Sequence, residues 1–389
     1  MRRTRTAAAI ATAAALAATA AVLAPATQAA PAATTKTIAS GLITPLRAAI
    51  APDGTAYVTQ NFAGQLVKVR PGKKPRRIYQ AKQPGAEVGA VSVRGSTVTF
   101  AITPAEEMPP ERALGRGFLT AEPRSAAAPS AKVMTLRQVK KKRGKSRTVV
   151  RTLADVGAYE AKRNPDGGVT YGFGDLDPEC SAMLPPFLNP YSGEVYSHPY
   201  ATATTKSKTY LADAGANDVL SISKSGKVRT VAVLPAVKVV FTQEVLDAAT
   251  AAELPLPPCV LGKTYIGEPV PTDIEVGPDG KLYVSTLGGG IGEILPLGAV
   301  YRIDPGSGKA RRVVDGLFAP TGVAVTGGGT IYASELFSGR IVRVRKGSSR
   351  VVTVATKPMP AEVEWAGGKL YATLNALAEG PTGKLVRFR

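Results

Sequence analysis

Hydrophobic and polar residues alternate with a period of two along most of this chain, and the alternating runs come in similar pairs. Residues 271–286 read PTDIEVGPDGKLYVST, with a Pro, an alternating run, a Gly-containing turn and a second run built around a Tyr. The same order begins at Pro45 and at Pro320, and in each copy the Tyr follows the Pro by twelve residues. Alternation buries one face of a strand, and Asp-Gly or Gly-Gly supplies the positive φ of a tight turn, so each copy is predicted to be a β-hairpin.

Further copies of this pattern extend the repeat along the whole chain. Three less regular hairpins are expected at residues 89–100, 198–213 and 360–373. A second pair of short strands, rich in Val and basic residues, follows several hairpins, at residues 65–80, 218–234, 299–316 and 339–355. Four strands per repeat and six repeats predict an all-β fold, a six-bladed β-propeller.

The two ends of the chain complement each other in this scheme. The last repeat stops after residues 383–389 with three strands made, and residues 35–42 form an unassigned alternating run near the start. We expect that N-terminal strand to complete the last blade and close the ring, which removes the exposed edges of an open sheet. Residues 33–389 are therefore predicted to form a single propeller domain.

The first 30 residues have the three-part pattern of a secretory signal peptide. Arg2, Arg3 and Arg5 precede an apolar run from Ala7 to Leu23, and small residues follow it. Cleavage is expected between about residues 26 and 32. The apolar run is shorter than the roughly 20 residues of a membrane-spanning helix, so no transmembrane segment is expected. The mature protein is predicted to be a secreted monomer, with attachment to the cell wall as an open alternative.

The chain has two Cys residues, Cys180 and Cys259, and no CxxC motif. An even pair in an exported protein favours a single structural disulfide, because the exterior of the cell is oxidising. Two unrelated buried thiols remain the alternative.

Four segments carry a specific family resemblance. They are DVGAYEAKRNPDGG (155–168), SHPYAT (197–202), YLADAGANDVLSIS (210–223) and VPTDIEVGPDGKLYVSTL (270–287). In these motifs the chain resembles the ScyD/ScyE-type family of exported, NHL-like β-propeller proteins, over essentially the whole mature length. The resemblance implies the propeller fold and export, but no activity, because members are generally described without one. The chain departs from the family by having His198 where Asn is usual.

Long segments interrupt the repeat at four places, and propeller geometry puts them all on one face. Residues 103–131 and 285–298 follow second strands, whereas residues 154–197 and 234–269 join consecutive blades. These are predicted to be irregular loop insertions. Because loops on a rigid scaffold commonly carry binding sites, the loop-rich face is the expected binding face, with a disulfide pinning two of its insertions.

Candidate site residues lie where the innermost strands begin and the second strands end. Arg47, Asp273 and Glu362 each follow a blade-opening Pro by two residues, and they are expected to surround the mouth of the central channel. Such a group could hold a cation or a small polar ligand, or it could hydrogen-bond strand ends and solvate the channel. The ligand-binding candidates are Arg47, Asp213, Asp273, Glu335, Glu362 and His198.

The sequence offers little catalytic chemistry. His198 is the only His, which excludes a His-rich zinc site, and there is no GxSxG motif for a serine hydrolase. Trp365, at an alternating position of a first strand, is expected to pack between blades. No catalytic residue and no cofactor are predicted. A non-enzymatic binding or scaffold protein is favoured, which binds a small molecule, an anionic wall polymer or another protein through its loop-rich face.

An enzyme remains the second hypothesis. Gluconolactonase-like six-bladed propellers are hydrolases that hold a divalent ion at the channel mouth, and carboxylates suit Ca²⁺ or Mg²⁺. The alternative metal ligands in this chain are Asp213, Asp273, Glu335 and Glu362. Arg47 argues against this reading, because a guanidinium repels a cation placed beside it.

The charge of the chain favours anionic partners. The net charge is +20, and removing residues 1–30 takes away three Arg and no acid, which leaves +17. Wall polymers and acidic lipids are candidate partners, whereas a basic surface that serves only solubility is the alternative. The most basic stretch, residues 137–147, has no aromatic residue to stack on bases, so nucleic acid is not expected.

Overall fold

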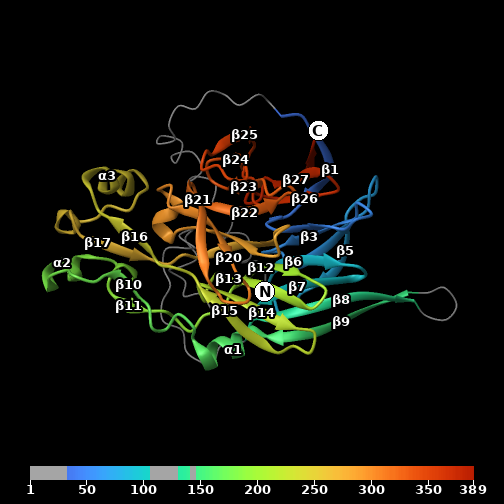
Figure 1. Ribbon diagram of the computed structural model, residues 1–389, viewed down its shortest axis with the longest axis horizontal. Helices are drawn as coiled ribbons and strands as arrows, with labels where there is room; N and C mark the ends of the chain where they lie inside the picture. Colours follow the sequence, from blue (N-terminus) through green and yellow to red (C-terminus); the bar gives the residue numbers. More distant parts are fainter. Residues whose placement is uncertain (1–32, 106–129, 141–145) are drawn as a thin grey trace, which may run out of the picture.

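The structure is a computed structural model that describes residues 33–105, 130–140 and 146–389. The predicted signal peptide, most of the first insertion and the turn of the basic hairpin at residues 140–145 lie outside the described residues. Strands dominate the structure, and they form seven four-stranded sheets (Figure 1). Pairing within each sheet is antiparallel, as the alternating pattern predicted.

Five sheets are made of four strands that are consecutive in the chain. The first three are β2 (Ala48–Ile50), β3 (Ala56–Gln60), β4 (Gln65–Val69) and β5 (Arg76–Gln80); β6 (Glu87–Arg94), β7 (Thr97–Thr103), β8 (Lys132–Lys140) and β9 (Ser146–Asp155); and β12 (Pro199–Thr204), β13 (Lys208–Asp213), β14 (Asp218–Ser223) and β15 (Val228–Val233). The other two are β18 (Pro271–Val276), β19 (Leu282–Thr286), β20 (Gly298–Ile303) and β21 (Ala310–Leu317); and β22 (Pro320–Val325), β23 (Ile331–Glu335), β24 (Arg340–Val344) and β25 (Val352–Thr356).

A sixth sheet joins the two ends of the described chain. It consists of β26 (Val363–Ala366), β27 (Lys369–Leu374), β28 (Gly383–Phe388) and β1 (Thr35–Leu42). Thr35 pairs with Phe388 and Leu42 with Gly383, so the N-terminal strand lies along the C-terminal one, as expected from the sequence. These six are called the main sheets, and each is named after its first strand, here the β26 sheet.

The first strands of the main sheets contact one another in a circular order. β2 lies against β6, β6 against β12, β12 against β18, β18 against β22, β22 against β26, and β26 against β2. This all-β arrangement of four-stranded sheets is that of a β-propeller. Turns that join first to second and third to fourth strands share one side, the turn face, and all other connections lie on the opposite side, the loop face.

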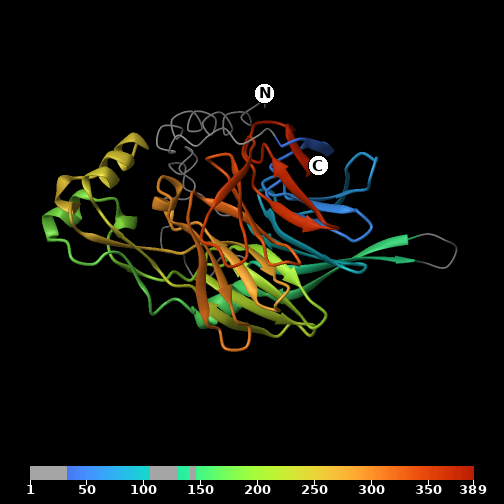
Figure 2. The same cartoon turned by 45° about the horizontal axis from the view of Figure 1, so that its top comes forward.

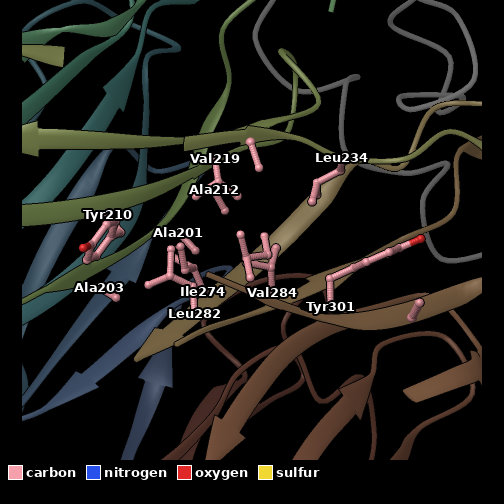
Figure 3. Close-up of a cluster of buried hydrophobic side chains, with 13 residues drawn as sticks. Ala201, Ala203, Tyr210, Ala212, Val219, Leu234, Ile274, Leu282, Val284 and Tyr301 are labelled. Carbon is pink, nitrogen blue, oxygen red and sulfur yellow. The ribbon is translucent and has the colours of Figure 1, made fainter. Parts of the chain in front are cut away.

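Apolar side chains from the faces of neighbouring main sheets form the core. Between the β12 and β18 sheets, Ala201 and Ala212 pack with Ile274 and Val284, and all four side chains are buried (Figure 3). The prediction for Trp365 is confirmed, because its ring stacks on Tyr332 of the neighbouring β22 sheet at 5.8 Å between centroids. The period-two alternation therefore serves to fill the spaces between sheets.

The repeated Pro marks a backbone feature that the sequence does not reveal. The residues before four of these prolines, Thr44, Val270, Ala319 and Met359, have positive φ values of 41–49°. Each of their carbonyl groups accepts a hydrogen bond from a backbone N–H just beyond the paired second strand, for example Leu287 N to Val270 O at 2.9 Å. A positive φ is unusual for residues such as Val, because it strains the backbone. The recurring hydrogen bond holds this backbone conformation in place at the start of each hairpin.

Two insertions form a compact unit, called here the insertion module, which comprises residues 156–198 and 234–270. Its sheet has the order β11 (Tyr191–Ser192), β10 (Thr170–Phe173), β17 (Thr264–Gly267) and β16 (Val237–Val240). Its helices are α1 (Val156–Arg163), α2 (Pro178–Met183) and α3 (Gln243–Ala251), with short 3₁₀ turns η3 (Pro186–Leu188) and η4 (Pro258–Val260). The module extends away from the main sheets, opposite to the β8–β9 hairpin (Figures 1 and 2).

The expectation of irregular insertions is wrong for the module. Its two central strands, β10 and β17, come from segments that are far apart in the chain, so no local hairpin pattern predicts their pairing. Phe173, Phe241 and Tyr265 pack edge to face at centroid distances of 4.9–6.1 Å and form a core of its own. Ile291 of η5 (Gly290–Glu293) joins this core, so three of the four predicted insertions lie together.

The predicted disulfide is present and lies within the module. Cys180 and Cys259 are bonded, with 5.9 Å between their Cα atoms, and they connect α2 with η4. No helix among residues 33–105, 130–140 and 146–389 is long and apolar enough to cross a membrane.

Removing the disulfide is expected to loosen the module and to spare the main sheets. A Cys180→Ser, Cys259→Ser variant loses the restriction of a loop with a sequence separation of 79, which is worth about 2–4 kcal/mol to the module. Hydrogen exchange should speed up in β10, β16 and β17, with little change in β12–β14. Equal acceleration in both regions would contradict the separate core of the module.

Candidate functional site

Three of the six predicted site residues come together at the centre of the main sheets. Arg47 immediately precedes β2, Asp273 lies in β18, and Glu362 immediately precedes β26. The guanidinium of Arg47 forms ion pairs with both carboxylates through one nitrogen, Nη2, at 2.8 Å from Glu362 Oε2. All three residues are at most 3% exposed, so this is a buried charge cluster, called here the central triad.

Arg47 also contacts two further main sheets. Its Nη1 donates a hydrogen bond to the carbonyl oxygen of Thr321 in β22 at 2.7 Å. Its guanidinium carbon lies 5.8 Å from the ring centroid of Tyr200 in β12, a cation–π distance. One side chain therefore connects the β2 sheet to the β12, β18, β22 and β26 sheets.

The electrostatics of the central triad are those of a buried ion cluster. Burial lowers the pKa of Arg47, but Asp273 and Glu362 outweigh it and the pKa is raised overall, so the guanidinium stays charged. Burial raises the pKa of Asp273 and of Glu362, and Arg47 opposes both shifts. Asp273 also accepts hydrogen bonds from the backbone N–H groups of Ile274 and Val323, each at 2.7 Å.

A cavity of about 300 Å³ extends from the central triad along the first strands towards the turn face. Side chains of β2, β6, β12, β18 and β26 line it, and exposed Arg94 and Lys206 lie at its turn-face end. The sequence predicted Arg47, Asp273 and Glu362 at a channel mouth, but here they form the buried inner end of the cavity. On the loop face, Leu46, Leu336, Ala361 and Ala376 form a buried apolar cluster at the ends of the β2, β22 and β26 sheets.

Two further carboxylates line the cavity, and sequence reasoning missed them. Glu275 and Glu364 lie two residues after Asp273 and Glu362 on the same strands, so alternation places each pair on one side of its strand. That signal was available in the sequence. Burial, then Glu364 and Asp273, raise the pKa of Glu275 well above its usual range. Burial and Asp273 raise the pKa of Glu364 to about 8, against the opposing effect of Arg47.

The remaining candidates lie outside the central triad. Glu335 is fully buried and binds the guanidinium of Arg340 through both oxygens, at 2.6 and 2.7 Å. Asp213 accepts hydrogen bonds from Ser197 Oγ at 2.5 Å and from the backbone N–H of His198 at 2.6 Å. The ring of His198 lies 3.2 Å from Glu87 Oε2. Each of these side chains supports a strand end or a connection between sheets.

The alternative metal set is not assembled at one point. Asp273 and Glu362 belong to the central triad, whereas Glu335 and Asp213 have the separate partners described above. Among residues 33–105, 130–140 and 146–389, no three His, Cys, Asp or Glu side chains are grouped so that they could hold a metal ion.

A second cluster of buried acids lies where the insertion module meets the β12 sheet. Asp213 and Asp218 are directly opposed across β13 and β14, and both are fully buried. Glu160 of α1, and Asp166 just after it, approach them closely enough to influence their ionisation. Like charges in directly opposed positions destabilise a strand pair, so this acidic cluster is costly unless protons neutralise it.

The acidic cluster has few compensating partners. Within the part of the chain that the structure describes, neither carboxyl group of Glu160 or Asp218 has a hydrogen-bond partner. Burial, followed by repulsion from Asp213 and Asp166, raises the pKa of Glu160 to about 8. Burial and the neighbouring acids raise the pKa of Asp218 well above its usual range. Glu160 therefore carries a proton at neutral pH.

We expect replacement of Arg47 to destabilise the protein strongly. Arg47→Met leaves two buried carboxylates without their cation, a change that costs about 3–5 kcal/mol of unfolding free energy. Adding Asp273→Asn and Glu362→Gln should recover much of this loss. Denaturant unfolding followed by the fluorescence of Trp365, the only Trp, measures the change. Exposed Arg70→Met is the control, and a loss below about 1 kcal/mol for Arg47→Met would refute the structural role.

The acidic cluster predicts that stability falls as pH rises. A carboxyl group with a pKa of 4.5 when unfolded and about 8 when folded stabilises the protein below pH 4.5, and this contribution is lost as pH rises to about 8. Glu160→Gln should therefore reduce the fall in Tm between pH 5 and pH 9 by a few degrees. Exposed Glu379→Gln should leave the pH profile unchanged. Parallel profiles for wild type and Glu160→Gln would contradict the assignment.

Comparisons with known proteins identify the fold and no family. No protein-family model and no curated protein matches the chain. A glucose dehydrogenase-type oxidoreductase from Thermus thermophilus has 14% identity and a TM-score of 0.54, covering 92% of this chain and 100% of its own. The PQQ-bound aldose sugar dehydrogenase of Streptomyces coelicolor has 14% identity and a TM-score of 0.50, covering 92% and 99%.

Another similar structure is the calcium-binding protein regucalcin from Agrobacterium tumefaciens. It is 10% identical, with a TM-score of 0.48, and the match covers 93% of this chain and 95% of regucalcin. Identities this low carry over the fold alone. The chain is thus similar in structure to β-propeller proteins.

Proposed function

We propose that this chain is an exported, closed six-bladed β-propeller that binds a small ligand with a cationic group in its central cavity, without catalysing a reaction. The circular contacts of the six first strands and the pairing of β1 with β28 support the closed ring. The signal-like leader and the Cys180–Cys259 bond support export. The resemblance to the ScyD/ScyE-type family agrees with both features.

The proposal of a cationic ligand rests on the residues that line the cavity. Four carboxylates line the cavity, those of Asp273, Glu275, Glu362 and Glu364. Arg47 lies among them and forms ion pairs with the inner two, Asp273 and Glu362. The outer pair, Glu275 and Glu364, therefore has room to receive a second cation. A volume of about 300 Å³ suits a small molecule. Arg94 and Lys206 at the turn-face end suit an anionic or hydroxyl group at the other end of the ligand.

This proposal moves binding from the loop face, where the insertions led us to expect it, to the axis of the propeller. The insertion module has its own core and disulfide, which favour a supporting role for the insertions. The hydrolase hypothesis has weaker support, because its four carboxylates are not grouped and Arg47 already occupies the two nearest the axis. Ca²⁺ or Mg²⁺ binding remains a hypothesis for experiment.

Binding of small amines tests this function. We expect 1,4-diaminobutane and 4-aminobutanoate to bind in calorimetry at pH 8, and the uncharged analogue butane-1,4-diol to give no heat. Affinity should rise as pH rises towards 8, because a cation binds the ionised form of Glu364, whose pKa is about 8 without ligand. Below that pH, binding should release a proton, which a change of buffer reveals.

The variants Glu275→Gln and Glu364→Gln should each weaken amine binding at least about tenfold, which corresponds to about 1.4 kcal/mol. Glu379→Gln on the loop face is the matched control, since its side chain is exposed and distant from the cavity lining. Equal binding of amine and diol, or unchanged binding in both cavity variants, would refute the proposal.

A further inference from the structure

Exposed basic side chains recur on the turns of the turn face. Most of the described turns on this face carry at least one exposed Lys or Arg. One from each of six turns is enough to show the distribution: Lys73, Arg94, Lys206, Lys227, Lys309 and Lys346. These turns belong to five different main sheets, so the basic side chains are spread around the axis rather than gathered in one corner.

Few acidic residues lie on the same turns, and those that do are bound to neighbouring groups. Asp304 forms an ion pair with Lys281 at 2.5 Å, and Asp279 pairs with Arg302 at 2.7 Å. Asp53 accepts a hydrogen bond from the backbone N–H of Thr55 at 2.9 Å. These carboxylates therefore do not offset the basic side chains of the other turns, and the turn face has a strongly positive potential.

The opposite end of the molecule has the opposite character. The insertion module exposes more acidic than basic residues, and its exposed acids are Asp175, Asp177, Glu179, Glu244, Asp247 and Glu253. A basic charge needed only for solubility would have no reason to avoid one end of the molecule. The separation instead orients the protein, with the turn face towards a negatively charged partner.

The exposed apolar side chains help to identify the kind of partner. Phe62, Phe337 and Met183 are 49%, 40% and 59% exposed, and they lie on the loop face or in the module. The described turn-face turns carry no large exposed apolar side chain, and the exposed apolar residue beside one of them, Val139 of β8 at 41%, is a single short side chain. Proteins that lie in a membrane interface combine basic charge with such apolar side chains. A charged polymer, which needs only spaced basic contacts, fits this face better than a membrane.

We propose that the turn face is a docking surface for a linear anionic polymer that bears repeated phosphate groups. The polymer lies across the turns and contacts basic side chains of several main sheets at once. Each contact is weak when taken alone, because exposed ion pairs contribute little and salt screens them. Several contacts along one polymer add up, and release of its counterions makes the binding steeply dependent on salt. This proposal does not depend on amine binding in the cavity.

Long-chain polyphosphate serves as the probe, with binding measured by fluorescence anisotropy at 50–300 mM NaCl. The turn-face variant combines Lys73→Gln, Lys227→Gln and Lys346→Gln, one substitution in each of three sheets. The control variant combines Lys82→Gln, Lys162→Gln and Lys238→Gln, three exposed lysines away from the turn face. Both variants have the same net charge, and Tm verifies that both are folded.

We expect the turn-face variant to bind polyphosphate at least about tenfold more weakly at 50 mM NaCl, with a salt dependence shallower by about three charges. The control variant should stay within about twofold of wild type, and orthophosphate at equal phosphate concentration should not compete. Equal weakening in both variants would show that net charge alone drives binding and would overturn the proposal. Tighter binding to phosphatidylglycerol vesicles than to polyphosphate, or no binding to polyphosphate at 50 mM NaCl, would also overturn it.

Discussion

The buried ion pairs of Arg47 are the constraint on which the centre of this molecule depends. A sheet in a ring touches only its two neighbours, yet Arg47 reaches side chains or carbonyl groups on four other main sheets. A charged group buried at this depth is stable only when its partners surround it, so the first strands of these five sheets must approach to the distances that the contacts set. The same cluster fixes the inner end of the cavity and decides which carboxylates remain for a ligand.

The loop face and the turn face of the propeller differ in structure and in charge. On the loop face, the disulfide-linked insertion module projects from the main sheets, and a cluster of buried apolar side chains packs at the ends of the β2, β22 and β26 sheets. On the turn face, short hairpins leave the cavity accessible and present basic side chains around it. The proposed cation site, inside a basic rim, suits a ligand that carries both charges, and a polyanion on the rim would lie directly beside the cavity. The two proposals therefore concern the same face but different ligands, a small molecule with a cationic group in the cavity and a polyanion on the turns.

The sequence could predict those parts of the structure that local patterns encode. Pro271 and the Asp-Gly turn before Tyr283 mark a hairpin because period-two burial and positive φ are properties of neighbouring residues. The pairing of Thr35–Leu42 with the C-terminal strand followed from the missing strand of the last repeat. The disulfide followed from a count of two Cys in a chain that is expected to be exported. The prediction that Arg47, Asp273 and Glu362 lie close together agrees with the structure, because each residue stands two positions after its Pro.

The parts that the sequence could not predict depend on distant segments. The pairing of β10 with β17 joins two insertions, neither of which contains a complete hairpin. The apolar cluster of Leu46 and Leu336 packs residues of different sheets together, which no local pattern encodes. Glu275 and Glu364 were within reach of the alternation argument, whereas the opposition of Asp213 and Asp218 required the register of β13 and β14.

A crystal structure of the mature protein grown with 1,4-diaminobutane tests the central claim most directly. The account predicts six sheets in a closed ring, Arg47 between Asp273 and Glu362, and a bound ammonium group between Glu275 and Glu364. A seventh sheet in the ring, or an Arg47 side chain turned away from both carboxylates with the amine bound elsewhere, would contradict it.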